Sequence, residues 1–137
     1  MLLVDTSVVV ASLNVREKHH RACSDLLMRA EETIVVPSPI LCEVDHLVHR
    51  IFGAAAMPAF LARIRAGELG VAESESDDLE RTIELMERYA DLDVGYVDAA
   101  VLAIVERLGE PKLATLDRRH FGAMRPRHVD ALELLPA

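Results

Sequence analysis

Two short apolar segments of the chain each run into an aspartate. Residues "LLV" precede Asp5, and "LATL" precedes Asp117. Both segments are typical of buried strands, and parallel α/β sheets bind ligands beyond the carboxyl ends of their strands. Adjacent strands lie about 4.8 Å apart, so we expect the two carboxylates to meet at one edge if the strands are neighbours. Taken singly, each aspartate is also a common cap of the turn after its strand.

Two further acids border the apolar faces of predicted helices. Glu43 lies between Ile40 and Leu47 in an apolar stripe with helical spacing. Asp98 lies near the start of another helix, three residues before Val101. The helix dipole favours a carboxylate there as well. We therefore expect two helices to bring a third and a fourth acid toward the two strand ends.

Four carboxylates at one end of a sheet would have raised pKa values or would require a cation. An all-oxygen set selects a hard divalent ion, Mg²⁺ or Mn²⁺. Such an ion can activate a water and neutralise a phosphoryl group, and two ions about 4 Å apart can hold both the attacking and the leaving oxygen. Arg118 and Arg119, directly after Asp117, could then hold phosphates. Their alternative is surface salt bridging to acidic side chains.

The histidines suggest a competing metal site. His46 and His49 lie three residues apart on one predicted helix, and His19 and His20 lie in an earlier segment. Zinc in proteins takes three or four nitrogen and sulfur ligands, and no such cluster is visible in the sequence. The oxygen-ligand hypothesis is therefore favoured.

The elements that must position these acids alternate along the chain. Apolar runs predict strands at residues 1–4, 33–36, 68–72, 112–115 and 131–135, the last at an edge. Apolar residues with helical spacing predict helices over 17–31, 38–52, 57–66, 76–90 and 96–108. Ser38 is the expected N-cap of the second helix, and Leu79 and Ile83 head the expected apolar face of the fourth. This alternation of short strands with helices is typical of a single α/β domain, residues 1–137, around a mostly parallel sheet.

Composition and charge limit the classes of function. The chain has 137 residues and a net charge of −8, which argues against a protein that coats nucleic acid. Residues 111–128 nevertheless hold five of the lysines and arginines, with Asp117 as their only acid. A basic rim around one site is therefore compatible with the negative net charge. Cys23 and Cys42 form no paired motif, and the N-terminus lacks the features of a signal peptide. We expect a soluble cytoplasmic protein that does not enter a membrane.

Four segments together resemble PIN-domain proteins, and more closely the VapC-type ribonuclease toxins of bacterial type II toxin–antitoxin operons. They are "LLVDTS", "SPILCEVDHLV" at 38–48, "YADLDVGYVDAAVLAIVERLG" at 89–109 and "LATLDRRHF" at 113–121. The resemblance covers essentially the whole chain in order and spacing. It implies a three-layer α/β/α sandwich, a homodimer, a cognate antitoxin as partner, and Mg²⁺- or Mn²⁺-dependent hydrolysis of RNA. The ending "LDRRHF" is similar to that of members that cut structured ribosomal or transfer RNA, one known target being the sarcin–ricin loop.

The resemblance also implies roles for single residues. Asp5 and Asp98 are expected as principal metal ligands, Asp117 as completing the metal shell, and Glu43 as holding a second metal or positioning water. Small hydroxyl positions beside the acids carry over as Thr6 and Thr115, and contacts to RNA phosphates as Arg118, Arg119, His120 and Arg125. The alternative is a non-catalytic or receiver-like metal-binding α/β module that acts through a protein partner. A receiver would need an acidic pair near the first strand, where Asp5 stands alone.

Overall fold

Five parallel strands form the centre of the molecule. The computed structural model describes residues 1–137 and contains strands β1 (Leu2–Leu3), β2 (Ile34–Pro37), β3 (Gly70–Ala72), β4 (Lys112–Ala114) and β5 (Glu133–Leu135). β1, β2 and β3 pair in parallel, as do β4 and β5. A parallel bridge between Val4 and Ala114 joins the two groups. The strand order is therefore β3-β2-β1-β4-β5, which places the ends of β1 and β4 side by side.

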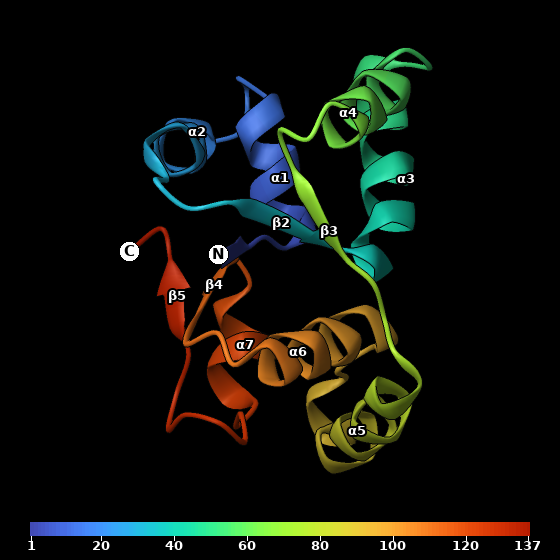
Figure 1. The fold of residues 1–137 in the computed structure, drawn as a ribbon, viewed down its shortest axis with the longest axis vertical. Coiled ribbons are helices and arrows are strands. Elements are labelled where there is room, and N and C mark those ends of the chain that lie inside the picture. Colours follow the sequence, from blue (N-terminus) through green and yellow to red (C-terminus); the bar gives the residue numbers. More distant parts are fainter.

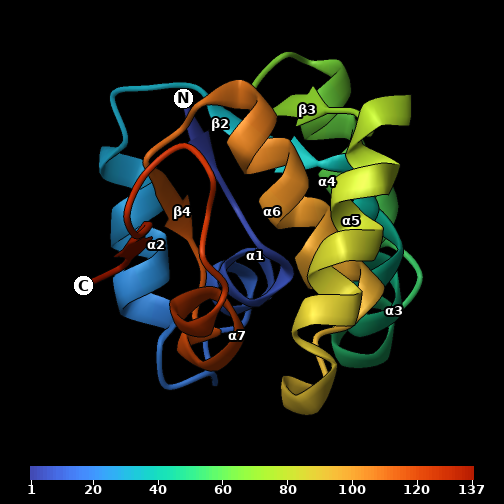
Figure 2. The ribbon, with the colours of Figure 1, turned by 90° about the horizontal axis from the view of Figure 1, so that it is seen from below.

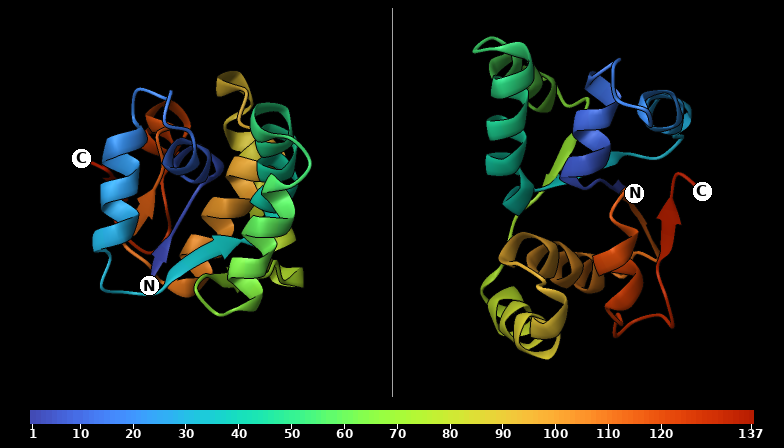
Figure 3. Two further views of the ribbon diagram at one scale, coloured as in Figure 1. Left: turned by 90° about the horizontal axis from the view of Figure 1, so that it is seen from above. Right: turned by 180° about the vertical axis from the view of Figure 1, so that it is seen from behind.

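Helices cover both faces of this sheet (Figure 1). One layer contains α1 (Thr6–Leu13), α2 (His20–Arg29), α3 (Leu41–Phe52) and α4 (Ala56–Arg65). The opposite layer contains α5 (Ser76–Arg88), α6 (Tyr96–Leu108) and α7 (Arg118–Ala123). The view from behind in Figure 3 shows the same two layers on either side of the strands. The expected three-layer α/β/α sandwich with a parallel sheet is thus confirmed.

The core lies between the sheet and the helices that flank its centre. Leu2, Leu3 and Val4 are buried on both faces of the sheet, which explains why the first strand is uniformly apolar rather than alternating. In α6, every residue from 99 to 105 is buried, because the sheet covers one side of this helix and α5 covers the other. Neither α6 nor any other helix is long and apolar enough to cross a membrane.

Most predicted elements are present, with bounds that differ by a few residues, but the start of α3 is different. Residues Ser38–Ile40 form a short 3₁₀ turn, and α3 follows from Leu41 without a side-chain cap. The Ser38 hydroxyl accepts instead from the backbone N–H of Ser74 at 3.2 Å. The prediction of Ser38 as an N-cap was wrong, because this hydroxyl joins two segments that are distant in the sequence.

Two other expectations need correction. No helix was predicted between the last two strands, and α7 lies there; with six residues it is too short to show an apolar period. The apolar face predicted for residues 76–90, Leu79, Ile83, Met86 and Tyr89 or Ala90, was wrong in its first half. Leu79 and Ile83 are 54% and 56% exposed, whereas Met86 and Tyr89 pack against the core. α5 packs on α6 through Thr82 and Leu85, and the sheet itself is already covered by α6.

Candidate active site

The acids predicted from the sequence come from four elements. Asp5 directly follows β1 and Val4 and lies at the start of α1, and Asp117 follows β4 and caps α7. Asp98 lies in the first turn of α6, and Glu43 lies in the first turn of α3. In Figure 2, β1 and β4 run in the same direction toward α1 and α7. The carboxyl edge of the central strands therefore carries the expected acidic site.

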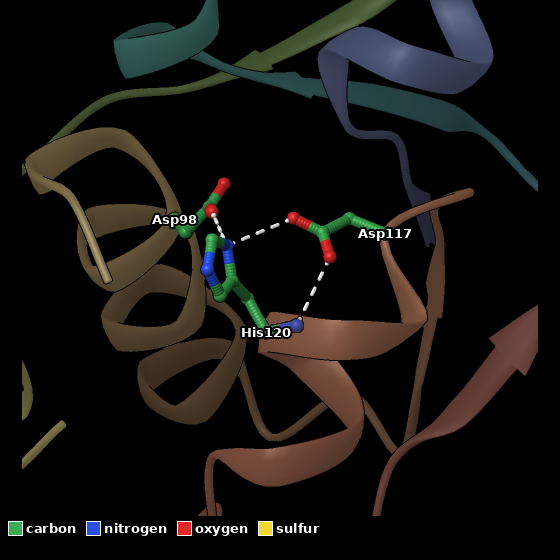
Figure 4. Close-up of side chains that lie close together, drawn as sticks. All are labelled: Asp98, Asp117 and His120. Atoms are coloured by element: carbon green, nitrogen blue, oxygen red, sulfur yellow. Dashed lines mark hydrogen bonds and ion pairs between the residues drawn. The ribbon is translucent and has the colours of Figure 1, made fainter. Parts of the chain in front are cut away.

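Three side chains form the centre of this site (Figure 4). The Nδ1 atom of His120 lies 2.8 Å from Oδ2 of Asp98 and 3.0 Å from Oδ2 of Asp117. Each of the three residues offers one atom that could ligate a metal, and these three atoms lie within 4.8 Å of one another. The other Asp117 oxygen accepts from the backbone N–H of His120 at 3.0 Å. α7 is thus capped by the same carboxylate that faces the site, so its helical start fixes the position of Asp117.

The hydrogen bonds of His120 define its protonation. Its Nε2 atom lies 3.0 Å from the carbonyl oxygen of Leu92, which can only accept, so Nε2 carries a hydrogen. Nδ1 faces two carboxylates and must carry a hydrogen as well. Burial alone would lower the pKa of His120, but the hydrogen bond to Asp98 and the charge of Asp117 raise it overall. The contacts of both ring nitrogens and the direction of this pKa shift favour the imidazolium form, which places one positive charge among the acids.

Asp5 is the most buried acid of the site, with 4% of its surface exposed. It has no cationic partner. Its Oδ2 atom accepts from the hydroxyls of Thr115 at 2.8 Å and Ser7 at 3.1 Å. Burial raises the pKa of Asp5, the two hydroxyl hydrogen bonds lower it, and the negative charge of Glu43 raises it further. The net result is a raised pKa, as is expected for a carboxylate without a countercharge.

The same hydroxyls tie Asp5 to the segment that carries Asp117. The Ser7 oxygen accepts from the backbone N–H of Leu116, and the Thr115 oxygen accepts from the backbone N–H of Asp117, each at 3.0 Å. Each hydroxyl thus donates to the carboxylate and accepts from the β4–α7 connection. Two strand ends are held in register by side chains in addition to the bridge at Val4.

Thr6 has a similar role on the other side of Asp5. Its hydroxyl donates to Oε1 of Glu43 at 2.7 Å, which connects α1 to α3. Glu43 itself is exposed to solvent. The structure therefore places Glu43 at the open rim of the site and Asp5 at its floor.

Asp98 carries the largest electrostatic perturbation. Burial raises its pKa, the hydrogen bond from His120 lowers it, and the charges of Asp5 and Asp117 raise it again, to about 6. The charge of one acid affects the next along the whole series, since Glu43 acts on Asp5 and Asp5 acts on Asp98. The four acids thus form one electrostatic unit, although only two of them lie in the tight cluster of Figure 4.

The four expected RNA contacts have different surroundings in the structure. The Arg118 guanidinium donates to the backbone oxygens of Leu134 and Pro136, and so holds the C-terminal tail. His120 lies inside the acidic site. Arg119 and Arg125 are exposed, and their guanidinium groups have no partner within the chain. Arg119 and Arg125 thus have fully free guanidinium groups, and the exposed Arg118 shares its guanidinium with the tail.

Sequence reasoning missed two groups that shape the site. Ser7 bonds both Asp5 and the β4–α7 connection, and its only signal was its place in the opening "DTS". The Leu92 carbonyl fixes the ring of His120 and has no sequence signal, because any residue supplies a carbonyl. His120 was expected to contact RNA, whereas its ring is directed at Asp98 and Asp117.

The donor set fits a hard divalent cation. Two carboxylates converge, a third with a raised pKa lies behind them, and the only countercharge is the imidazolium of His120. Carboxylates suit Mg²⁺ and Mn²⁺. Asp98, Asp117 and Asp5 are therefore the residues suited to hold such an ion. His120 lies among the oxygen ligands predicted from the sequence, but as an imidazolium it has no lone pair to offer a metal and acts as a countercharge.

A parallel sheet between two helical layers, with acids at the carboxyl edge of the sheet, is the arrangement of a PIN domain. The chain belongs to that family, because the family model described as "PIN domain" matches residues 2–125. The ribonuclease VapC26 of Mycobacterium tuberculosis is 30% identical over 125 residues, which cover 91% of this chain and 93% of that protein. The resemblance stated from the four segments is confirmed, and the receiver-like alternative is not compatible with this family.

Solved structures show the same fold. The crystal structure of the sarcin–ricin loop cleaving toxin VapC20 of Mycobacterium tuberculosis matches with a TM-score of 0.78 and 23% identity, and covers 95% of this chain and 99% of that one. The DNA-bound VapBC of Salmonella typhimurium matches with a TM-score of 0.68 and 17% identity over 98% of both chains. At these identities the two structures support the fold of the chain.

Proposed function

We propose that this chain is a metal-dependent endoribonuclease and the toxin of a toxin–antitoxin pair. One observation carries the proposal: Asp5, Asp98 and Asp117 share one end of the sheet with a single countercharge, in a chain 30% identical to a ribonuclease over 91% of its length. A structural ion-pair network would have balanced its charges. Acids with raised pKa values at the carboxyl ends of strands are instead typical of a site for catalysis.

The chain's own residues have distinct tasks in this proposal. Asp98, Asp117 and Asp5 would hold Mg²⁺ or Mn²⁺. When bound, such an ion would neutralise charge on the phosphoryl oxygens and lower the pKa of a water molecule. Glu43, held by the Thr6 hydroxyl at the open rim, positions the attacking water. His120 keeps the two carboxylates of Figure 4 at hydrogen-bond distance from one nitrogen.

Substrate and partners follow from the same family likeness. Arg119 and Arg125, whose guanidinium groups are free, contact phosphates of the RNA, because a guanidinium can donate two hydrogen bonds to one phosphate. We expect a structured RNA, a cognate antitoxin that covers the acids, and a homodimer. The antitoxin is supported by the VapBC complexes of Salmonella typhimurium and Rickettsia felis, which share the fold.

Cleavage of RNA by the purified chain tests the proposal. Total bacterial RNA incubated with the protein and Mg²⁺ should yield discrete ends, which sequencing of those ends would map, and EDTA should prevent cleavage. Asp98→Asn should lower the rate by at least about a thousandfold, since the interaction of a metal with the transition state contributes several kcal/mol. Asp77→Asn, an exposed acid on α5, is the matched control and should keep full activity.

Two results would contradict the proposal. Full activity of Asp98→Asn would remove the acidic site from the reaction. Absence of cleavage by the folded wild-type chain, with any RNA fraction and with either Mg²⁺ or Mn²⁺, would favour the alternative of a PIN domain that only binds a partner.

A further inference from the structure

A polar cavity lies between the C-terminal half of α5 and the segment that follows α7. Its volume is about 590 Å³. Its charged lining consists of Arg81, Arg88, Arg125, Arg127, Glu84 and Glu87. No hydrophobic residue lines it. We call it the arginine cavity.

Its four arginines fall into two pairs with different roles. Arg81 donates to both oxygens of Glu106, at 2.8 and 2.9 Å, and is 11% exposed, so it is a buried structural ion pair. Arg127 is held by Glu84. Arg88 and Arg125 have no carboxylate partner, and Arg88 lies 5.6 Å over the ring of its neighbour Tyr89. The paired arginines build the wall, and the other two leave their guanidinium groups free.

The arginine cavity is connected to the acidic site through two short contacts. The Tyr89 hydroxyl accepts from the backbone N–H of Arg125 at 2.9 Å, on the cavity side. Three residues further, the Leu92 carbonyl bonds His120, on the side of the acids. In Figure 2, α7 and the end of α5 lie at the same end of the molecule. The segment of residues 89–92 and α7 thus join the wall of the cavity to the acidic site.

We propose that the arginine cavity binds a backbone phosphate of the RNA substrate, at a position away from the cut. The inference rests on the proposed ribonuclease function and adds a second contact to it. Two free guanidinium groups match one phosphodiester, which carries one negative charge and accepts paired hydrogen bonds from arginine. A contact beyond the cut favours a folded RNA, whose backbone comes near the protein at separate points.

An acidic protein segment fits the cavity less well than RNA does. Interfaces between proteins are enriched in aromatic and apolar side chains at their centre, and this cavity offers none. Interfaces with nucleic acid are more polar and more positively charged. Glu84 and Glu87 in the wall also repel a run of carboxylates more strongly than they repel the single charge of one phosphodiester.

Binding measured without cleavage tests the inference. The background is Asp98→Asn, so that RNA stays intact, and the probes are a fluorescein-labelled RNA hairpin and an unstructured strand of equal length. Arg88→Gln with Arg125→Gln should weaken hairpin binding about tenfold or more, since hydrogen bonds to charged groups contribute about 1.5–3 kcal/mol each. The slope of log affinity against log salt should become shallower by about 1, the change expected for one lost phosphate contact.

The matched control removes the same charge elsewhere. The control combines Arg29→Gln and Arg65→Gln. These two arginines lie on α2 and α4, in the other helical layer (Figure 1), and are exposed and without ion pairs. This control should keep both affinity and salt slope. Equal hairpin binding by the two double variants would overturn the inference, while RNA cleavage by the wild-type chain would still support the proposed function. A polyglutamate peptide that needs Arg88 and Arg125, with RNA binding unchanged, would assign the cavity to a protein and also overturn it.

Discussion

Asp5 and Asp78 are buried equally well, at 4% and 5% exposure, but their surroundings are opposite. The two oxygens of Asp78 accept from Nε of Arg107 at 3.0 and 3.2 Å, and one of them also accepts from the backbone N–H of Glu75. Asp5 accepts from two neutral hydroxyls and a backbone N–H, and no cation lies beside it. One carboxylate has a cation of the chain beside it, and the other has none.

The difference extends to the regions around each acid. Between α5 and α6, Arg81 pairs with Glu106 and Arg107 pairs with Asp78, so the charges balance and join the two helices. At the carboxyl edge of the sheet, several acids share the imidazolium of His120. Buried carboxylates therefore have a structural role where the chain supplies the cation, and they suggest an ion-binding role where it does not.

Exchanging each buried acid for asparagine should give opposite effects on stability. Asp78→Asn removes the buried partner of Arg107 and leaves it only the exposed Glu75, so we expect a loss of about 3 kcal/mol in the free energy of unfolding. Asp5→Asn removes an uncompensated charge and should leave metal-free protein equally stable or more stable. Urea unfolding in EDTA measures both. A loss for Asp5→Asn comparable to that for Asp78→Asn would mean that Asp5, too, serves the fold.

The stability of the acidic site should also depend on pH. The folded pKa of Asp98 is about 6 and its ordinary value is 3.8, so the folded state binds more protons between these values. Stability of the metal-free protein therefore falls as pH rises from about 4 to about 6, by about 2 kcal/mol for this partly exposed group. His120 acts in the same direction, because its pKa is raised: its contribution is present at low pH and is lost as pH rises through the folded value.

Mg²⁺ should reverse this slope. A cation held by the acids binds the folded state alone and needs deprotonated ligands, so its stabilisation grows with pH. Melting temperatures from about pH 4 to about pH 8, in EDTA and in excess Mg²⁺, should diverge above about 6, the pKa of Asp98. In the Asp98→Asn variant the two curves should nearly coincide. If Mg²⁺ raised the melting temperature of this variant as much as that of the wild-type chain, the ion would bind elsewhere.

The sequence was most informative where a local pattern and the fold act together. Asp5 and Asp117 were identified because each ends an apolar run, and parallel strands bring such ends to one edge. The hydrogen bond of His120 to Leu92 could not be predicted, because a backbone carbonyl has no sequence signature. The exposed Leu79 likewise depends on which neighbour α5 packs against, a property of the complete fold.

The smallest effect we predict compares two buried threonines, one in each region. The Thr115 hydroxyl donates to Asp5 at 2.8 Å, and the Thr82 hydroxyl donates to the backbone oxygen of Asp78 at 2.7 Å. Substitution by valine keeps the shape of each side chain and removes one hydroxyl. The hydrogen bond from Thr115 lowers the pKa of Asp5, so Thr115→Val should raise that pKa further and weaken the binding of Mn²⁺.

We expect about a tenfold loss of Mn²⁺ affinity for Thr115→Val, the usual effect of losing a group that orients a ligand. Thr82→Val should leave Mn²⁺ affinity unchanged, because its hydroxyl bonds only the helix in which it lies. Calorimetric titration with Mn²⁺ measures both variants. Thr115→Val should also lose more stability than Thr82→Val, because it leaves the backbone N–H of Asp117 unpaired. Unchanged Mn²⁺ affinity in Thr115→Val would separate Asp5 from the ion and leave Asp98 and Asp117 as its carboxylate ligands. A tenfold loss would show that the Thr115 hydroxyl, which joins two strand ends, also contributes to metal affinity. The same hydroxyl donates to Asp5 and accepts from the backbone N–H of Asp117.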